Sequence, residues 1–311
     1  MNMKNKLLIT TALVALTAVT NAYALEITEG DNILQNAYNE DLIISGGNNS
    51  VEDTFVAIGS PADEKNLTIK GGTTTLTSSS LNSESGTITM SDGTINLEGN
   101  ENSGLWAAKD INISGGTINM NGLDSSIDTF YDLLDGGEQL PAPETPGNIN
   151  ITGGTINVNG ANGEISTEGK INISNAEINI ASKSTLASYS NDDKKEKGTF
   201  LLGSGANINL SGTLLANVNG AGNVNFKTSS SKADGNITGS NLTFEADHSL
   251  SKAISGTIGD LTSLNINKGT LTYDKQTGKI GNLNVVGGLD IGTNTVNATK
   301  VDFKENSTLK F

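Results

Sequence analysis

The 311-residue chain contains no cysteine and no arginine, and it has one histidine and one tryptophan. Without cysteine it can form no disulfide, no thiolate zinc site and no cysteine nucleophile. Without arginine it lacks the planar guanidinium that holds a phosphate or carboxylate through two hydrogen bonds. Many common binding and catalytic chemistries are therefore excluded from the start.

Positive charge and aromatic side chains are also scarce. The 19 basic residues are all lysine and face 34 acidic residues, which gives a formal net charge of −15. This charge disfavours nucleic acid and anionic membrane surfaces as partners. Aromatic residues make up 4% and hydrophobic residues 35% of the chain, which is low for a domain with one thick core. The apolar residues are nevertheless too regularly placed for a disordered chain.

Residues 1–24 have the pattern of a signal peptide. Two lysines precede an uncharged run from Leu7 to Val19, and Ala22-Tyr23-Ala24 follows as a small-x-small cleavage signal. At about 1.5 Å per residue, this run is far shorter than the roughly 30 Å hydrocarbon core that a membrane anchor must cross. We expect cleavage after Ala24 and export of residues 25–311 as one domain.

A repeat of about 22 residues organises the exported part. Five copies align without a gap: LTIKGGTTTLTS from Leu67, ITMSDGTINLEG from Ile88, INISGGTINMNG from Ile111, INITGGTINVNG from Ile149 and INISNAEINIAS from Ile171. Two further, degenerate copies are read from Ile208 and Leu264. Repetition at this period indicates a solenoid, a stack of similar coils.

The elements of each unit are strands, because apolar and polar residues alternate with a period of two. A corner separates two strands, and its first position predicts a left-handed backbone, since glycine, aspartate and asparagine tolerate positive φ. That position holds Gly71, Asp92, Gly115, Gly153 and Asn175. A weaker third strand is expected before the pair, for example at 104–108 and 199–202.

Three strands per coil predict an all-β parallel β-helix of about eleven or twelve coils. The alternative is an antiparallel β-sandwich, which also has short strands and glycine-rich turns. Sandwich turns vary from hairpin to hairpin, whereas this corner recurs in register. The N-terminal stretch 25–50 is expected to cap the first coil.

Two insertions are expected to leave the stack. The first, 123–147, holds three of the four prolines and six acidic residues. Ile127, Phe130, Tyr131 and Leu134 follow helical spacing there, which predicts a short amphipathic helix. Its apolar face either packs on the stack or binds a partner through Phe130 and Tyr131. The second insertion, 182–198, carries a mixed charge run typical of a solvated loop.

Stacked coils should align amide side chains on the outer surface. Asn119, Asn157 and Asn179 occupy equivalent outward positions together with Asn96, and Asn112, Asn150 and Asn172 form a second set. At a strand spacing of about 4.8 Å, such amides form ladders. The ladders either stiffen the stack or make a polar contact face, and Asn119, Asn157 and Asn179 are the candidate contacts.

No constellation typical of an enzyme or of a cofactor site is present. His248 stands alone without a nucleophile motif, so we expect it at the surface or at an edge. Carboxylate pairs are the remaining catalytic option, but Glu164 and Glu168 lack a specific pattern. Calcium ligation by Asp124, Asp128 and Asp132 is considered, although the known calcium-loop patterns are absent. We predict no cofactor, no metal and no enzymatic activity.

The signal peptide, units such as KDINISGGTINMNG and the closing VDFKENSTLKF resemble the passenger region of Gram-negative autotransporter proteins. The resemblance covers most of residues 25–311 and implies a right-handed, pectate-lyase-like parallel β-helix at the cell surface. That family carries an outer-membrane barrel after the passenger, and no barrel strands follow here. We expect a fragment of a longer protein, or a chain that is released or held by something else.

The resemblance implies adhesion or autoaggregation, with host glycans, matrix proteins or a second copy as partners. Two alternatives stay open. One is a carbohydrate-active β-helix, a glycosidase or lyase that uses carboxylates beside the insertions. The other is a structural spacer that holds another domain away from the cell.

Overall fold

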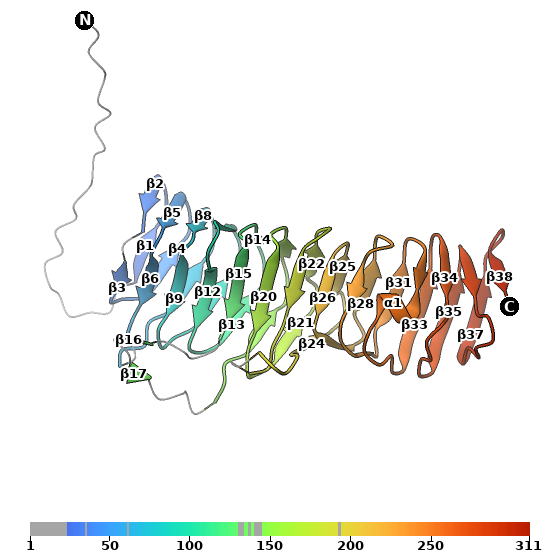
Figure 1. Ribbon diagram of the computed structural model, residues 1–311. Coiled ribbons are helices and arrows are strands. Elements are labelled where there is room, and N and C mark those ends of the chain that lie inside the picture. The colour runs from blue at the N-terminus through green and yellow to red at the C-terminus, as the bar shows by residue number, and fades with distance from the viewer. Residues whose placement is uncertain are drawn as a thin grey trace, which may run out of the picture.

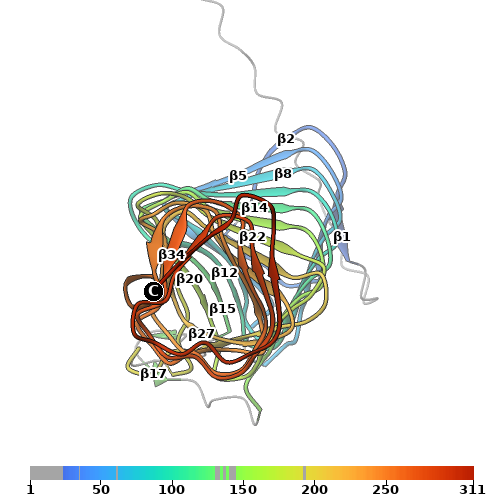
Figure 2. The same ribbon diagram turned by 90° about the vertical axis from the view of Figure 1, so that its right-hand side faces the viewer.

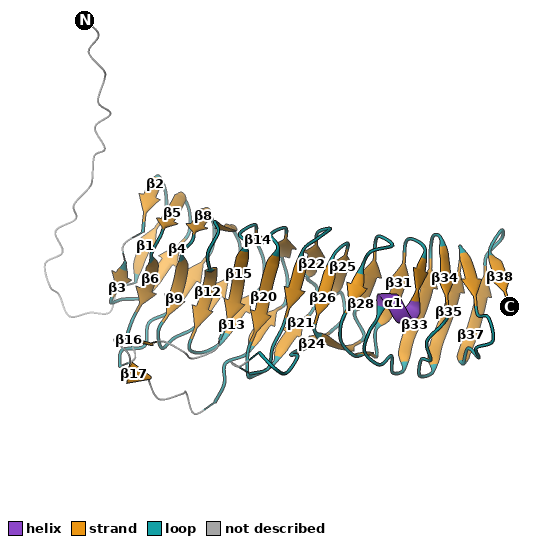
Figure 3. Ribbon diagram, viewed as in Figure 1, coloured by secondary structure: helices purple, strands orange, loops and turns teal. Residues whose placement is uncertain are grey.

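The computed structural model describes residues 24–34, 36–60, 62–129, 134–135, 138–139, 145–191 and 194–311. These residues form a rod in which the chain coils about 12 times around one axis (Figure 1). Viewed along the axis, successive coils lie one behind another and are progressively displaced, so that the N-terminal coils project beyond the C-terminal ones (Figure 2). Strands cover nearly the whole rod, and one short helix interrupts them (Figure 3). The predicted all-β parallel β-helix is confirmed.

Sheet B runs the full length of the rod and holds 13 parallel strands. Its strands are β2 (Asp31–Ile33), β5 (Asn48–Glu52), β8 (Thr73–Thr77), β11 (Thr94–Glu98), β14 (Thr117–Met120), β19 (Thr155–Val158), β22 (Glu177–Ile180), β25 (Asn207–Leu210), β28 (Asn223–Phe226), β31 (Asn241–Phe244), β33 (Leu261–Ile266), β35 (Ile280–Val285) and β37 (Ala298–Phe303). Within it Ile95 pairs with Ile118, and Ile118 pairs with Ile156.

Sheet A precedes sheet B in the first ten coils and holds 10 parallel strands. Its strands are β1 (Leu25–Ile27), β4 (Leu42–Ile44), β7 (Leu67–Ile69), β10 (Ile88–Met90), β13 (Ile111–Ile113), β18 (Ile149–Ile151), β21 (Ile171–Ile173), β24 (Thr199–Leu202), β27 (Asn217–Gly220) and β30 (Ile237–Thr238). Leu25 pairs with Leu42, so the predicted cap at 25–50 is wrong and this stretch forms regular coils.

Sheet C follows sheet B and holds nine parallel strands. Its strands are β3 (Ala37–Tyr38), β6 (Phe55–Ile58), β9 (Ser80–Ser83), β12 (Ser103–Ala107), β15 (Asp124–Asp128), β20 (Asn162–Ser166), β23 (Thr185–Ala187), β26 (Thr213–Leu215) and β29 (Lys232–Ala233). Near the C-terminal end a four-stranded sheet and one helix follow. They comprise β32 (His248–Ser249), α1 (Leu250–Ala253), β34 (Thr270–Thr272), β36 (Gly288–Asp290) and β38 (Thr308–Lys310).

The core is a column of aliphatic side chains inside the coils. Ile111 and Ile113 are buried, whereas Asn112 between them faces outward. Each coil repeats this alternation, so every layer places its aliphatic side chains on those of the coil below. Burying one such side chain contributes about 1.5–3 kcal/mol, and the thin core is sustained by repetition along the axis.

The corners are left-handed as predicted, but at the second position in four of the five aligned copies. Positive φ angles occur at Gly72 (74°), Gly93 (91°), Gly116 (81°) and Gly154 (80°), and in the fifth copy at Asn175 (48°). The glycine also fits tightly, since a Cβ at Gly116 would lie 2.7 Å from the carbonyl oxygen of Gly93. The prediction of positive φ at the first position is therefore wrong for these four coils.

The helix predicted across the first insertion is wrong. Residues 124–128 form β15, where Ile127 is fully buried and pairs with Leu105 and Ile165 of the adjacent coils. Core burial of alternate residues overrides the helical spacing. Farther along, β16 (Leu134–Asp135) and β17 (Glu138–Gln139) pair in antiparallel orientation. Residues 124–128 therefore belong to the coil, and the predicted start of the insertion at 123 is wrong.

Three other features predicted from the sequence repeat are also wrong. The second insertion does not begin at 182, because 185–187 is β23 of sheet C. The strand at 199–202 pairs with β21 and so belongs to sheet A, not to the third face. The copies read from Ile208 and Leu264 start in sheet B, where Ile208 pairs with Ile178. Strands of sheets A and B share the same alternation followed by a small turn, so the sequence does not separate them.

The N-terminal segment 1–23, which includes nearly all of the predicted signal peptide, lies outside the described residues. Among the residues that are described, no helix has the length and apolar character needed to cross a bilayer.

Candidate binding surfaces

An asparagine ladder runs along the outer face of sheet B. Asn119 donates its amide N–H to Asn96 Oδ1 at 2.9 Å and accepts one from Asn157 at 2.9 Å. Asn179 donates to Asn157 at 3.0 Å. The ladder continues through Asn209 and Asn225, with amide bonds of 2.8 and 2.9 Å. The predicted stacking of Asn119, Asn157 and Asn179 is confirmed, and their role as partner contacts stays a prediction.

A shorter ladder lies on sheet A, as predicted. Asn150 donates to Asn112 Oδ1 and Asn172 donates to Asn150 Oδ1, both at 2.9 Å. An amide bonded only along the stack, such as that of Asn119 or Asn157, keeps a second N–H and a second lone pair for a partner at the side, whereas Asn209 also donates to Glu177. The two faces therefore present regularly spaced donors and acceptors.

The other predicted contacts, Phe130 and Tyr131, lie outside the described residues.

A groove of about 410 Å³ crosses the outer face of sheet C, and we call it the Trp106 groove. Its lining includes Trp106, Asp124, Ser126, Asp128, Glu164, Tyr189 and Lys194. Parallel register brings them together, because Trp106 pairs with Asp128 and Ser126 pairs with Glu164 across neighbouring coils. The sequence separates these residues by one or two repeats, so the groove was not predicted. The lone tryptophan at an outward strand position was the signal available.

The second insertion is tied across the Trp106 groove by an ion pair. Lys194 Nζ lies 2.6 Å from Glu164 Oε2 and 5.8 Å from the ring centre of Tyr189. Burial alone lowers the pKa of Lys194, but the hydrogen bond and charge of Glu164 outweigh it, so the pKa is raised. The lysine stays charged, and it fixes one wall of the groove.

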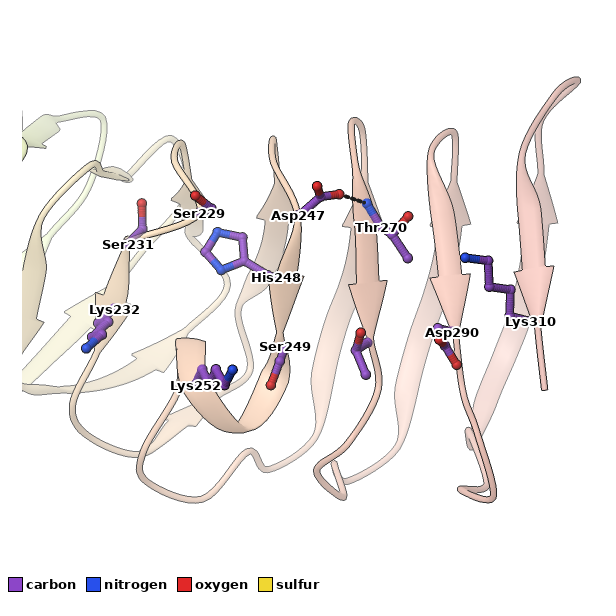
Figure 4. A pocket seen from close by; sticks show the side chains of 11 residues that line it. Ser229, Ser231, Lys232, Asp247, His248, Ser249, Lys252, Thr270, Asp290 and Lys310 are labelled. Atoms are coloured by element: carbon purple, nitrogen blue, oxygen red, sulfur yellow. Dashed lines mark hydrogen bonds between the residues drawn. The ribbon is translucent and has the colours of Figure 1, made fainter.

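A second groove, of about 670 Å³, lies beside α1 near the C-terminal end (Figure 4). Its charges are mixed, with Lys232, Lys252 and Lys310 set against Asp247 and Asp290. Asp247 Oδ1 accepts the backbone N–H of Thr270 at 2.6 Å, which ties two coils together. This arrangement has no single charge preference that would select a ligand.

His248 lines this second groove but is only 7% exposed. Its ring packs edge-on against Phe226 and Phe244, at centroid distances of 5.7 and 5.2 Å. The prediction of a surface or edge position is wrong, because the rings of Phe244 in the same coil and Phe226 in the preceding coil enclose the imidazole. Burial lowers the pKa of His248, although a backbone hydrogen bond to Thr228 and the charge of Asp247 oppose this.

The candidate acidic residues do not all lie at one site. Glu164 and Asp124 line the Trp106 groove, whereas Glu168 does not. Asp132 of the calcium candidates lies outside the described residues. Within the described part of the chain, no three histidine, aspartate or glutamate side chains gather in a way that would hold a metal ion.

Comparison of the chain with protein-family models, with curated proteins and with solved structures gives no match. The geometry of the rod and of its grooves is therefore the basis for assigning a function.

Proposed function

We propose that this chain is an exported, non-enzymatic β-solenoid of the cell surface that mediates adhesion or autoaggregation, as an autotransporter passenger does. Export rests on the signal-peptide pattern of residues 1–24. The passenger assignment rests on the resemblance of the repeats. The observation that carries the adhesive role is the asparagine ladder, which crosses six consecutive strands from Asn96 to Asn225.

A ladder of this kind suits contact with another polar surface. Its amides are held at the strand spacing of about 4.8 Å, so their free donors and acceptors are already ordered before a partner arrives. An identical ladder on a second copy has the same spacing and the complementary groups. Self-association is therefore the simplest adhesive contact that the face supports, with host matrix proteins and glycans as further partners.

The test uses beads coated with purified chain from residue 25 onward. Turbidity reports aggregation of the beads, and retention on immobilised matrix proteins and glycans reports adhesion. We expect the wild-type beads to aggregate. The double variant Asn119→Asp, Asn157→Asp should reduce aggregation, because the carboxylates on the ladders of two contacting copies then repel each other. Asn219→Asp, an exposed asparagine on sheet A, is the matched control.

Beads that bind neither one another nor any matrix protein or glycan would contradict the adhesive role and favour a spacer. Release of new reducing ends from a polysaccharide would contradict the non-enzymatic part. Such release would favour the carbohydrate-active alternative, for which the carboxylates of the Trp106 groove are the candidates.

A further inference from the structure

We propose that the Trp106 groove binds a short neutral oligosaccharide. The inference rests on the proposed adhesive function, for which it supplies a ligand class and a site separate from the asparagine ladder. The ladder lies on sheet B, whereas the groove lies on sheet C.

The tryptophan of the groove favours a sugar as the ligand. Trp106 is the only tryptophan of the chain, and it lies partly exposed on the outer face of a solenoid strand. Its indole N–H donates to Ser126 Oγ of the next coil at 2.6 Å. A large apolar ring that is held at a wet surface by its polar edge is a platform for a ligand with both apolar and polar faces. The C–H face of a sugar ring is such a ligand.

The neighbouring glycine lets the indole lie along the sheet. A Cβ at Gly104 would lie 2.5 Å from Trp106 Nε1 and 2.7 Å from Ser126 Oγ. Because glycine has no side chain, the edge of the ring rests over positions 104 and 126 and does not stand away from the sheet. This fixes the ring before any ligand binds, which lowers the entropic cost of binding.

The polar groups of the groove match hydroxyl groups. Asp124 and Glu164 offer carboxylate oxygens on two adjacent strands, and Asn162 adds an amide, one N–H of which it donates to Asp124 at 2.9 Å. Glu164 Oε1 is buried and has no hydrogen-bond partner among the described residues. A buried acceptor without a donor is costly, and a turn of the carboxylate toward the groove would bring it to a sugar hydroxyl that supplies the donor. A few placed polar groups around an aromatic ring are typical of ligand sites.

The size of the groove favours an oligosaccharide over a single sugar. Its lining comes from β12, β15, β20, β23 and β26, five strands that are neighbours in sheet C. Four strand spacings give about 19 Å along the rod, with Trp106 at one end. Tyr189, held under Lys194, supplies a second aromatic ring from the insertion.

Charge then selects among sugars. The lining holds three carboxylates and one lysine, and that lysine is already paired with Glu164. Acidic polysaccharides are therefore repelled, while uncharged sugars still donate hydrogen bonds from their hydroxyl groups to the carboxylates. The ligand of the Trp106 groove is therefore a neutral sugar.

The test uses the fluorescence of Trp106, which reports on this groove alone because the chain has no other tryptophan. The probes are neutral hexasaccharides of glucose, xylose, mannose and galactose, an anionic hexamer of galacturonic acid and a cationic hexamer of glucosamine. At least one neutral probe is expected to shift the Trp106 emission saturably, with calorimetry giving the affinity. The galacturonic acid hexamer is expected not to bind.

Two aromatic substitutions test whether the oligosaccharide binds in the Trp106 groove. Trp106→Ala should weaken binding at least about tenfold in calorimetry, the factor that corresponds to about 1.4 kcal/mol. Tyr189→Ala, in the insertion and away from the core, should weaken binding as well and serves if Trp106→Ala does not fold. Phe55→Ala is the matched control, because Phe55 is an exposed aromatic residue of the same sheet outside the groove.

Three results would overturn the inference: no neutral hexasaccharide binds at millimolar concentration, only the glucosamine hexamer binds, or binding survives both aromatic substitutions. The bead assay on the same protein separates the two proposals. Beads that aggregate while no neutral sugar binds would remove the sugar site and leave the adhesive function. Failure of both assays would remove both.

Discussion

Asn157 lies in the middle of the asparagine ladder, where it donates to Asn119 Oδ1 at 2.9 Å and accepts from Asn179 at 3.0 Å. The three residues are 38 and 22 positions apart in the chain, yet they are neighbours on adjacent strands. The ladder therefore bonds each coil to the next through side chains as well as through the backbone.

Asn157→Ala is expected to remove both of these side-chain bonds. A net contribution of about 0.5–1.5 kcal/mol per bond predicts a loss of about 1–3 kcal/mol in unfolding free energy. Urea denaturation followed by circular dichroism measures this loss. Asn219→Ala should cost less than half as much, since among the described residues Asn219 makes no side-chain hydrogen bond. Equal losses in the two variants would show that the ladder adds nothing.

Gly104→Ala is expected to displace the indole of Trp106. The new methyl group would lie 2.5 Å from Nε1, so the ring must move and the bond to Ser126 must break. The emission of the sole tryptophan should shift to the red and iodide should quench it more strongly. Ser126→Ala removes the acceptor without a clash and should give a smaller change. An unchanged emission spectrum for Gly104→Ala would contradict the described ring position.

His248 is expected to make the rod less stable in mild acid. Burial lowers its pKa in the folded state, so the unfolded chain takes up a proton first as the pH falls. The stability is complete above the unfolded pKa of about 6.5 and is lost as the pH falls through that value toward the lower folded one.

His248→Phe, which packs with Phe226 and Phe244, should lose less stability than the wild type between pH 7.5 and pH 5. Thermal unfolding at the two pH values measures the difference. A parallel decline in both proteins would show that His248 does not titrate in this way.

Asp274 is expected to act in a lower pH range. Its burial raises the pKa, but hydrogen bonds donated by Ser249 and Ser251 outweigh this, and the pKa is lowered. The stabilisation is therefore present above the unfolded pKa of about 3.9 and is lost as the pH falls through the folded value.

Asp274→Asn should lower the midpoint of thermal unfolding at pH 7, and the difference from the wild type should shrink by pH 3. Because Asp274 is largely exposed, the effect should stay near 1 kcal/mol or below. Glu305→Gln is the control, an exposed carboxylate with no hydrogen bond or ion pair among the described residues. A difference that persists unchanged at pH 3 would assign the effect to shape and not to charge.

The sequence by itself determined the architecture. Ile111, Asn112 and Ile113 recur with the same alternation in coil after coil, and only parallel stacking buries all the aliphatic residues while aligning the asparagines. The period, the strands and the ladders through Asn119, Asn157 and Asn179 could be predicted because each depends on local spacing. The left-handed corner could be predicted too, although its exact position in the turn could not.

The tertiary structure alone decided which side chains of different coils meet. Trp106, Ser126 and Glu164 form one groove because their strands are in register, and the sequence shows no local signal for such a long-range contact. Ile127 followed a helical pattern, but the core of the neighbouring coils required a strand there. His248 is likewise buried by the rings of Phe226 and Phe244, which lie on other strands. Local spacing determines how a coil forms, and stacking determines what each coil contacts.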